Sequence, residues 1–134
     1  MTEPGFPIAR LKIRPDFLAA AKAPSCARGS VVLQARDRAD DQPLVRVGFT
    51  ATKKVGGSVI RNRAKRRMRE AARLLIPVLA KPGYDYVFIA RGGAPTRPWE
   101  RLLDDVKSAL ISLAADNDPR ARASVRAPSA DPGP

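Results

Sequence analysis

The stretch that decides the fold is VRVGFTATKKVGGSVIRNRAKRRMREAARLLIPVLAKPGYDYVFIAR, residues 45–91. At its start, over residues 44–52, Val and Phe alternate with Arg, Gly and Thr, and this period of two predicts a half-buried strand. Residues 83–91 at its end form a nearly continuous apolar run that predicts a buried strand. Between them a helix is predicted from Ser58, a plausible N-cap, to just before Pro77. The order strand, helix, strand predicts a βαβ crossover with helices packed against a sheet.

The flanking segments add elements on both sides of this crossover. Pro15 is a favourable first helical residue and opens a short helix that Pro24 ends. Residues 30–36 contain three consecutive apolar residues and predict another strand. Pro98 precedes a last helix, in which apolar residues recur at helical spacing. The fold class expected from these elements is α+β, an α/β sandwich.

The length of 134 residues suits one domain. Residues 116–134 contain four prolines and few large apolar side chains. Such a segment cannot bury enough surface to offset its ordering entropy, so we expect it to be a disordered tail. Residues 1–8 are expected to fray for similar reasons, which leaves a single folded domain over residues 9–115.

The histidine and cysteine counts exclude several kinds of catalytic and metal site. The chain has no histidine and one cysteine, Cys26. A Ser-His-Asp or Cys-His site therefore cannot form, and neither can a His/Cys zinc site or a disulfide framework. We interpret Cys26 as structural. No signal-peptide pattern opens the chain and no run approaches the roughly 18 apolar residues of a membrane span, so the expected location is cytoplasmic, with no membrane partner.

The positive charge is concentrated in one segment. The chain has 25 Lys and Arg against 13 Asp and Glu, a formal net charge of +12. Residues 53–73 hold nine basic residues and one acidic residue, Glu70, and so contribute +8 of that total. A local patch of this kind indicates a polyanionic partner.

The predicted helix that begins at Ser58 separates this charge from an apolar stripe. The stripe consists of Ile60, Ala64, Met68, Ala71 and Leu75. A basic ridge beside it consists of Arg61, Lys65, Arg69 and Arg73. Like charges at i,i+4 cost about 0.2–0.5 kcal/mol each in an isolated helix, so the ridge is interpreted as a binding surface for an anion.

A folded RNA fits this surface better than other polyanions. The helix has no heptads, which disfavours a basic-zipper DNA reader. The loop KKVGGS, residues 53–58, lacks the residue order of a nucleotide-binding P-loop. Its glycines nevertheless lead into a helix N-terminus, which can receive a phosphate. The few aromatic residues predict limited base stacking.

The central segment resembles a known family. Its hallmark is Arg61-Asn62-Arg63, followed by Lys65-Arg66 and Arg69-Glu70, within the run Val47–Glu70. The segments Arg10-Leu11-Lys12, Asp16-Phe17 and Tyr84–Arg91 resemble the family's opening and its last strand. Over roughly residues 9–114 the chain is thus similar to the bacterial ribonuclease P protein subunit.

This resemblance implies a fold and a function. The family order is αβββαβα, with a central mixed sheet and a left-handed βαβ crossover. The family's partner is a large catalytic RNA, one protein per RNA, and the holoenzyme removes the 5′ leader of precursor tRNA by endonucleolytic cleavage. Mg²⁺ held mainly by the RNA performs the hydrolysis, so the resemblance implies no protein catalytic residue. A cleft between the first helix, the sheet and the basic helix binds the single-stranded leader.

The resemblance also assigns roles to individual residues. The expected RNA-binding residues are Lys53, Lys54, Arg61, Asn62, Arg63, Lys65, Arg66 and Arg69. The expected leader-cleft residues are Phe17, Gln34, Arg46 and Thr50. For Arg46 and Thr50, the residue pattern alone is equally compatible with a merely solvated strand face. Ala21 and Gln34 stand where the family often has aromatic residues, which predicts weaker stacking on leader bases.

The acidic residues predict no metal site. Asp104 and Asp105 are adjacent on a predicted helix and point about 100° apart, so they cannot hold one metal ion together. Asp37, Asp40 and Asp41 are interpreted as a solvated turn.

Two other functions stay open beside that of a ribonuclease P protein subunit. The alternatives are a structural RNA-binding protein, such as a ribosomal component, and a self-sufficient nuclease.

Overall fold

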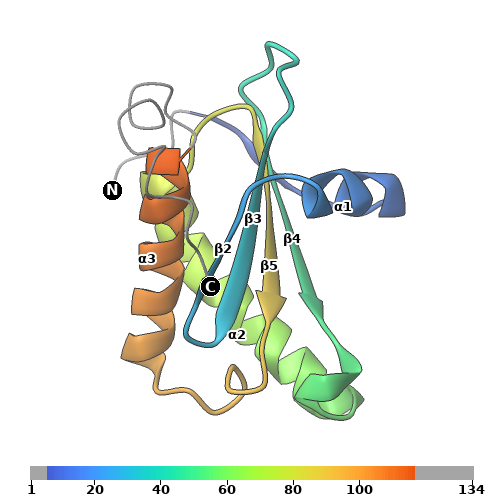
Figure 1. Cartoon of the computed structure of the whole chain (residues 1–134), viewed down its shortest axis with the longest axis vertical. Coiled ribbons are helices and arrows are strands. Elements are labelled where there is room, and N and C mark those ends of the chain that lie inside the picture. Colours follow the sequence, from blue (N-terminus) through green and yellow to red (C-terminus); the bar gives the residue numbers. More distant parts are fainter. Residues whose placement is uncertain (1–5, 117–134) are drawn as a thin grey trace, which may run out of the picture.

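The computed structural model describes residues 6–116, in which three α-helices and one 3₁₀ turn accompany five strands. In chain order the elements are β1 (Ile8–Arg10), α1 (Arg14–Ala21), β2 (Ser25–Arg28), β3 (Val31–Asp37), β4 (Val45–Ala51), η1 (Lys53–Val55), α2 (Ser58–Leu79), β5 (Tyr84–Ala90) and α3 (Trp99–Asp116). Figure 1 shows the sheet between α1 on one side and α2 and α3 on the other. The predicted disordered tail beyond Asp116 lies outside the described residues.

The strands form one mixed sheet in the order β1-β4-β5-β3-β2. Strands β1, β4 and β5 run parallel, whereas β3 is antiparallel to both β5 and β2. The α+β class and the predicted βαβ crossover are therefore confirmed, with α2 connecting β4 to its neighbour β5. In Figure 1 both strands run downward, β5 lies to the left of β4 and α2 passes behind them, so the crossover is left-handed. It departs from the right-handed default, as the resemblance implied.

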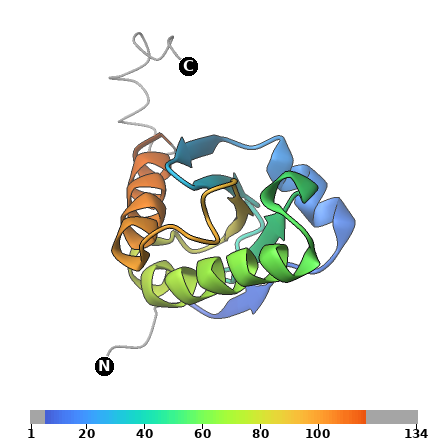
Figure 2. The same cartoon turned by 90° about the horizontal axis from the view of Figure 1, so that it is seen from below.

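The sheet has a hydrophobic core on each face. Figure 2, seen along the strands, shows α1 and α3 on opposite sides of the sheet. On the larger side, alternate residues of the central strands, such as Val47 and Phe88, pack against α2 and α3. On the other face α1 covers a smaller cluster of Leu11, Ala20 and Val87. The period-two pattern of β4 places its valines on the α2 face and leaves its polar residues on the α1 face.

Several boundaries differ from the expectations. Ile8, placed in the frayed N-terminus, is the first residue of β1 and pairs with Val45. Ser58 was predicted as the N-cap of α2 but is its first residue, and Gly57 is the N-cap without a side-chain hydrogen bond. Pro77 does not end α2, which continues to Leu79.

The apolar stripe of α2 is also shifted from its predicted position. The buried residues of this helix are Ala64, Met68, Ala71, Ala72 and Ile76. Ile60, predicted to belong to the stripe, is 39% exposed. Ile76 is fully packed against the core, and this packing holds the last turn in helical form although proline removes one backbone donor there.

A buried carboxylate fastens the β2–β3 turn to α3. Asp105 accepts hydrogen bonds from the backbone N–H of Ser30 at 3.0 Å, its hydroxyl at 2.9 Å and Arg97 at 2.7 Å. Burial alone would raise the pKa of Asp105, but the hydrogen bonds from Arg97 and Ser30 hold it below its ordinary value. Gly29 lies against this carboxylate with φ +52°, and a Cβ there would stand 2.3 Å from Asp105 Oδ1.

The substitution Gly29→Ala is therefore expected to lower the free energy of unfolding by about 1–3 kcal/mol from backbone strain alone, with a further loss from the displaced carboxylate. Urea denaturation followed by circular dichroism measures the difference. Gly92→Ala is the matched control, because a Cβ at Gly92 meets nothing within 4 Å. Equal stability of the two variants would contradict a tight turn at Gly29.

Candidate nucleic-acid interface

The turn that precedes α2 requires glycine at position 56. After β4 the chain makes η1, which carries exposed Lys53 and Lys54. Gly56 follows with φ +148°, and a Cβ there would lie 2.9 Å from the side chain of Ile60. The turn delivers both lysines to the N-terminal end of α2, whose first turn contains no acidic residue.

The exposed side of α2 carries six of the eight residues predicted to bind RNA. This α2 basic face consists of Arg61, Asn62, Arg63, Lys65, Arg66 and Arg69. Four of them, Asn62, Lys65, Arg66 and Arg69, line one shallow depression of about 310 Å³. The structure therefore brings these four side chains together, and Arg61 and Arg63 lie on either side of them around the helix.

The charge on this face is not neutralised by any carboxylate of the described residues. In the part of the chain that the structure describes, none of the six side chains nor either η1 lysine forms an ion pair. Arg73, predicted as the end of the basic ridge, is the exception: its guanidinium pairs with Glu70, and this hydrogen bond lowers the pKa of Glu70. Dense, unpaired cations at one surface attract phosphates.

Two arginines of α2 are set apart by burial. Arg67 donates hydrogen bonds to the carbonyl oxygens of Ala94, at 2.7 Å, and Arg97, so it anchors α2 to the loop before α3. Burial, and then the charge of Arg63, lowers the pKa of Arg67. The Nε–H of Arg61 is buried and has no hydrogen-bond partner within residues 6–116, a costly state for a donor.

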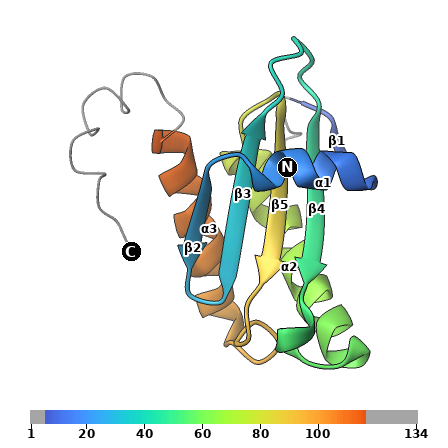
Figure 3. The same cartoon turned by 45° about the vertical axis from the view of Figure 1, so that its right-hand side comes forward.

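The opposite face of the sheet holds the residues predicted to line a leader cleft. Figure 3 shows α1 crossing this face over the central strands. Phe17 of α1 packs on β4 at Gly48, where a Cβ would stand 2.6 Å from the phenyl ring. Gln34 of β3 and Gly48 of β4 both pair with Val87 of β5, one on each side of it. Thr50, which is half-buried, follows Gly48 by two residues on β4. Phe17, Gln34 and Thr50 thus share the α1 face.

Arg46 lies on the same face but is held by carboxylates. It donates to Asp85 at 2.7 and 2.8 Å and to Asp16 at 3.0 Å, and its hydrogen bond to Asp85 raises its pKa. Asp85 is fully buried and also accepts from Arg38 at 2.9 Å and Arg36 at 3.4 Å. The solvated-face interpretation is wrong for Arg46, which joins α1 to the sheet.

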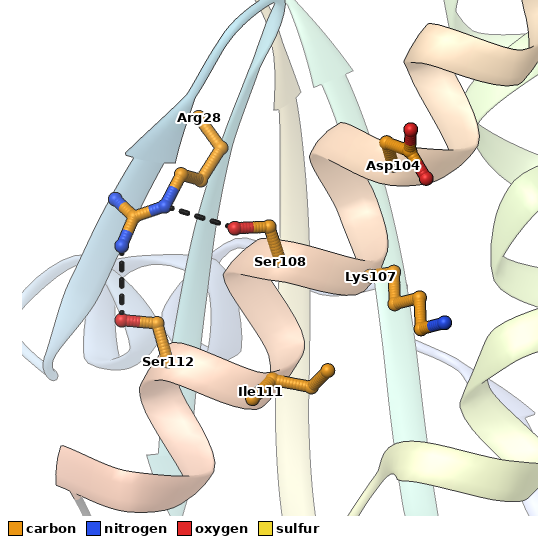
Figure 4. Close-up of a pocket in the computed structure, with 6 residues that line it drawn as sticks. All are labelled: Arg28, Asp104, Lys107, Ser108, Ile111 and Ser112. Atoms are coloured by element: carbon orange, nitrogen blue, oxygen red, sulfur yellow. Dashed lines mark hydrogen bonds between the residues drawn. The ribbon is translucent and has the colours of Figure 1, made fainter.

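A second depression lies along α3 and differs in character. It has a volume of about 450 Å³, and Figure 4 shows Arg28 of β2 pointing toward two serines of α3. Arg28 donates to Ser108 at 3.1 Å and to Ser112 at 3.2 Å. These two hydrogen bonds hold β2 on α3. The depression along α3 shares no lining residue with the depression on α2.

Two acidic residues at the turn between β3 and β4 make local contacts. Asp40 pairs with Arg38 at 2.9 Å, and Asp37 accepts the backbone N–H of Ala39 at 2.9 Å. Over residues 6–116, no three His, Cys, Asp or Glu side chains gather in a way that could hold a metal ion. Within the same range, no helix combines the length and apolar character needed to span a bilayer.

Comparisons with known proteins agree with this geometry. The sequence model of the family described as Ribonuclease P matches residues 7–114. The ribonuclease P protein component of Caulobacter vibrioides is 72% identical over 109 residues, 81% of this chain and 73% of that protein. The corresponding protein of Ruegeria pomeroyi is 52% identical over 110 residues, 81% of this chain and 88% of that protein.

Solved structures share the fold. The RNase P protein of Staphylococcus aureus superimposes with a TM-score of 0.66 at 25% identity, over 78% of this chain and 94% of that chain. The RNase P protein of Thermotoga maritima gives 0.61 at 30% identity, over 74% and 96%. The family match and the close relatives together show that this chain belongs to the bacterial ribonuclease P protein family, the protein component of a ribonucleoprotein endonuclease that processes tRNA.

Proposed function

We propose that the protein binds the catalytic RNA subunit of ribonuclease P through the α2 basic face, with Lys53 and Lys54 beside it, as one protein per RNA in the cytoplasm. The observation that carries this proposal is the row of cations on α2 that have no ion-pair partner among residues 6–116. A helix selected only for solubility would gain stability from glutamates placed four residues from these arginines. Glu70 is the only acidic residue of α2, and it pairs with Arg73, which lies C-terminal to the α2 basic face.

The 5′ leader of precursor tRNA is proposed to bind on the α1 face of the sheet. Phe17 offers an aromatic ring, while Gln34 and Thr50 offer hydrogen-bonding groups at half-buried positions. Arg46 fixes α1 to the sheet through Asp16, which keeps Phe17 in place over Gly48. A single-stranded leader suits this surface because its bases are free to stack.

In this proposal the protein acts by position and charge, and endonucleolytic removal of the leader is catalysed by the RNA. The donor set of the described residues does not fit a metal site, so Mg²⁺ is assigned to the RNA subunit. By neutralising phosphates and fixing the leader, the protein tightens substrate binding and reduces the Mg²⁺ concentration that cleavage requires.

Reconstitution with the RNA subunit and precursor tRNA tests the proposal. We expect cleavage by the RNA alone at high Mg²⁺, and cleavage at low Mg²⁺ only when the protein is added. Cleavage by the protein alone would favour a self-sufficient nuclease. Binding to RNA without any effect on cleavage would favour a structural RNA-binding role.

The substitution Phe17→Ala is expected to weaken holoenzyme affinity for precursor tRNA about fivefold to tenfold, as expected for the loss of one base-stacking contact. Affinity for mature tRNA, which lacks the leader, should be unchanged. Filter binding with both tRNAs measures the ratio. Leu18→Ala is the control, because Leu18 is an exposed apolar neighbour on α1. Equal losses for both tRNAs would remove Phe17 from the leader site.

A further inference from the structure

A pocket that shares only Arg69 with the proposed RNA and leader contacts lies between β1, β4 and α2. Its volume is about 390 Å³, within the roughly 300–1,000 Å³ usual for small-molecule sites. Its apolar walls are Ile8, Val47, Phe49, Ala72, Ile76 and Pro77. Its polar lining is Arg10, Arg69, Arg73 and Glu70. We refer to it as the β1–α2 pocket.

Two guanidinium groups converge on one aromatic ring in this pocket. Arg10 of β1 lies 5.4 Å from the ring centroid of Phe49, and Arg69 of α2 lies 5.9 Å from it. Phe49 is itself stacked on Phe88, with ring centroids 5.2 Å apart. Cation–π contact holds each guanidinium in place, so the two like charges are fixed near one another at the mouth of an apolar hollow.

Neither guanidinium has a counter-charge within the described chain. No ion pair within residues 6–116 involves Arg10 or Arg69, and the nearby carboxylate of Glu70 is taken by Arg73. Two fixed cations without a shared carboxylate repel each other, and an anion placed between them removes that cost. The pocket therefore combines an apolar hollow with an anion site at its mouth.

We propose that the β1–α2 pocket binds one unpaired nucleotide of the RNA subunit, with its base among the apolar walls and its phosphate between Arg10 and Arg69. This inference rests on the proposed function. A base within a duplex is stacked and paired, so only an unpaired base can enter a pocket. A planar, apolar-faced group attached to a phosphate matches the charge and the lining of this site.

Continuity with the α2 basic face identifies the RNA subunit as the source of this nucleotide. Arg69 lines both the α2 depression and the β1–α2 pocket. The proposed leader site lies on the other face of the sheet, beneath α1. An RNA strand that crosses α2 at Lys65 and Arg66 therefore reaches Arg69, and the pocket follows immediately beside it.

Two variants separate the phosphate contact from the base contact. Arg10→Ala is expected to weaken binding of the RNA subunit about fivefold and to lower the salt slope of log K by about 0.7–0.9. Lys12→Ala is the matched control, since Lys12 is an exposed cation two residues away and outside the pocket. Ile8→Trp places a bulky side chain at the pocket wall without changing charge, and it is expected to weaken binding about tenfold.

Base-specific chemical probing of the RNA subunit gives a second measurement. We expect one unpaired base to be protected by the unmodified protein and by Lys12→Ala, and to become reactive with Arg10→Ala and with Ile8→Trp. Thermal unfolding checks that each variant is folded. An Arg10→Ala effect without any base effect of Ile8→Trp would overturn the base pocket, because the contact would then be to phosphate alone.

The outcomes also separate this inference from the function on which it rests. If the unmodified protein does not bind the RNA subunit, the proposed function fails. If it binds, and Arg10→Ala behaves like Lys12→Ala with no base deprotected, the pocket assignment fails while the α2 interface stands.

Discussion

Replacing Asp85 with asparagine is expected to lower the free energy of unfolding by about 3 kcal/mol, near the lower end of the cost of breaking a buried ion pair. The carboxylate is fully buried and accepts hydrogen bonds from Arg36, Arg38 and Arg46. Asparagine keeps the shape but removes the charge, so the guanidiniums lose their shared counter-charge. Two of them, Arg36 and Arg46, reach solvent in part, which moderates the loss.

Chemical denaturation of Asp85→Asn and Asp104→Asn measures the effect. Asp104 is an exposed carboxylate of α3 that forms no ion pair within the described residues, so its amide variant should differ from the unmodified protein by less than about 0.5 kcal/mol. A loss below about 1 kcal/mol for Asp85→Asn would show that the three arginines are well solvated without the carboxylate.

The central crossover could be predicted from the sequence because its signals are local. Alternation along β4 and helical spacing along α2 each involve residues within a few positions of one another. The handedness of the crossover had no such signal. Local physics favours the right-handed form, and the left-handed form was expected from the family resemblance alone.

Elements that depend on distant partners were not predictable in this way. Strand β1 has three residues, Ile8–Arg10, which is too short for any periodicity, and it exists because β4 offers an edge for pairing. Pro77 was expected to end α2, but tertiary packing of Ile76 outweighed the local preference. The pocket role of Arg10 follows from β1 and was invisible for the same reason.

The candidate site also contains parts with a local sequence signal and parts that depend on residues distant in the sequence. The α2 basic face was predicted because its charge is concentrated in one helix, and no carboxylate of the described chain pairs with it. The partner of Arg46 was missed, since Asp85 lies on another strand. A signal existed: Asp85 stands between two tyrosines in an apolar run, and a charge buried there must be paired.

The double substitution Arg63→Ala/Arg66→Ala is expected to weaken binding of the RNA subunit about 20-fold at physiological salt, with a fall of about 1.4–1.8 in the salt slope of log K for two lost phosphate contacts. Both side chains are exposed and form no ion pair within the described chain. Their removal should therefore change the free energy of unfolding by less than about 0.5 kcal/mol. Filter binding over a salt series measures the slope.

The double substitution Arg101→Ala/Lys107→Ala is the matched control for the α2 variant. Both residues are exposed on α3, so the control removes the same charge from a surface outside the proposed interface. Binding through the α2 basic face requires the control to keep the original salt slope, because its cations contact no phosphate. If both pairs lower the slope equally, the RNA responds to net charge alone, and α2 loses its special role. If only the α2 pair does so, the unpaired cations of that helix bind the RNA directly.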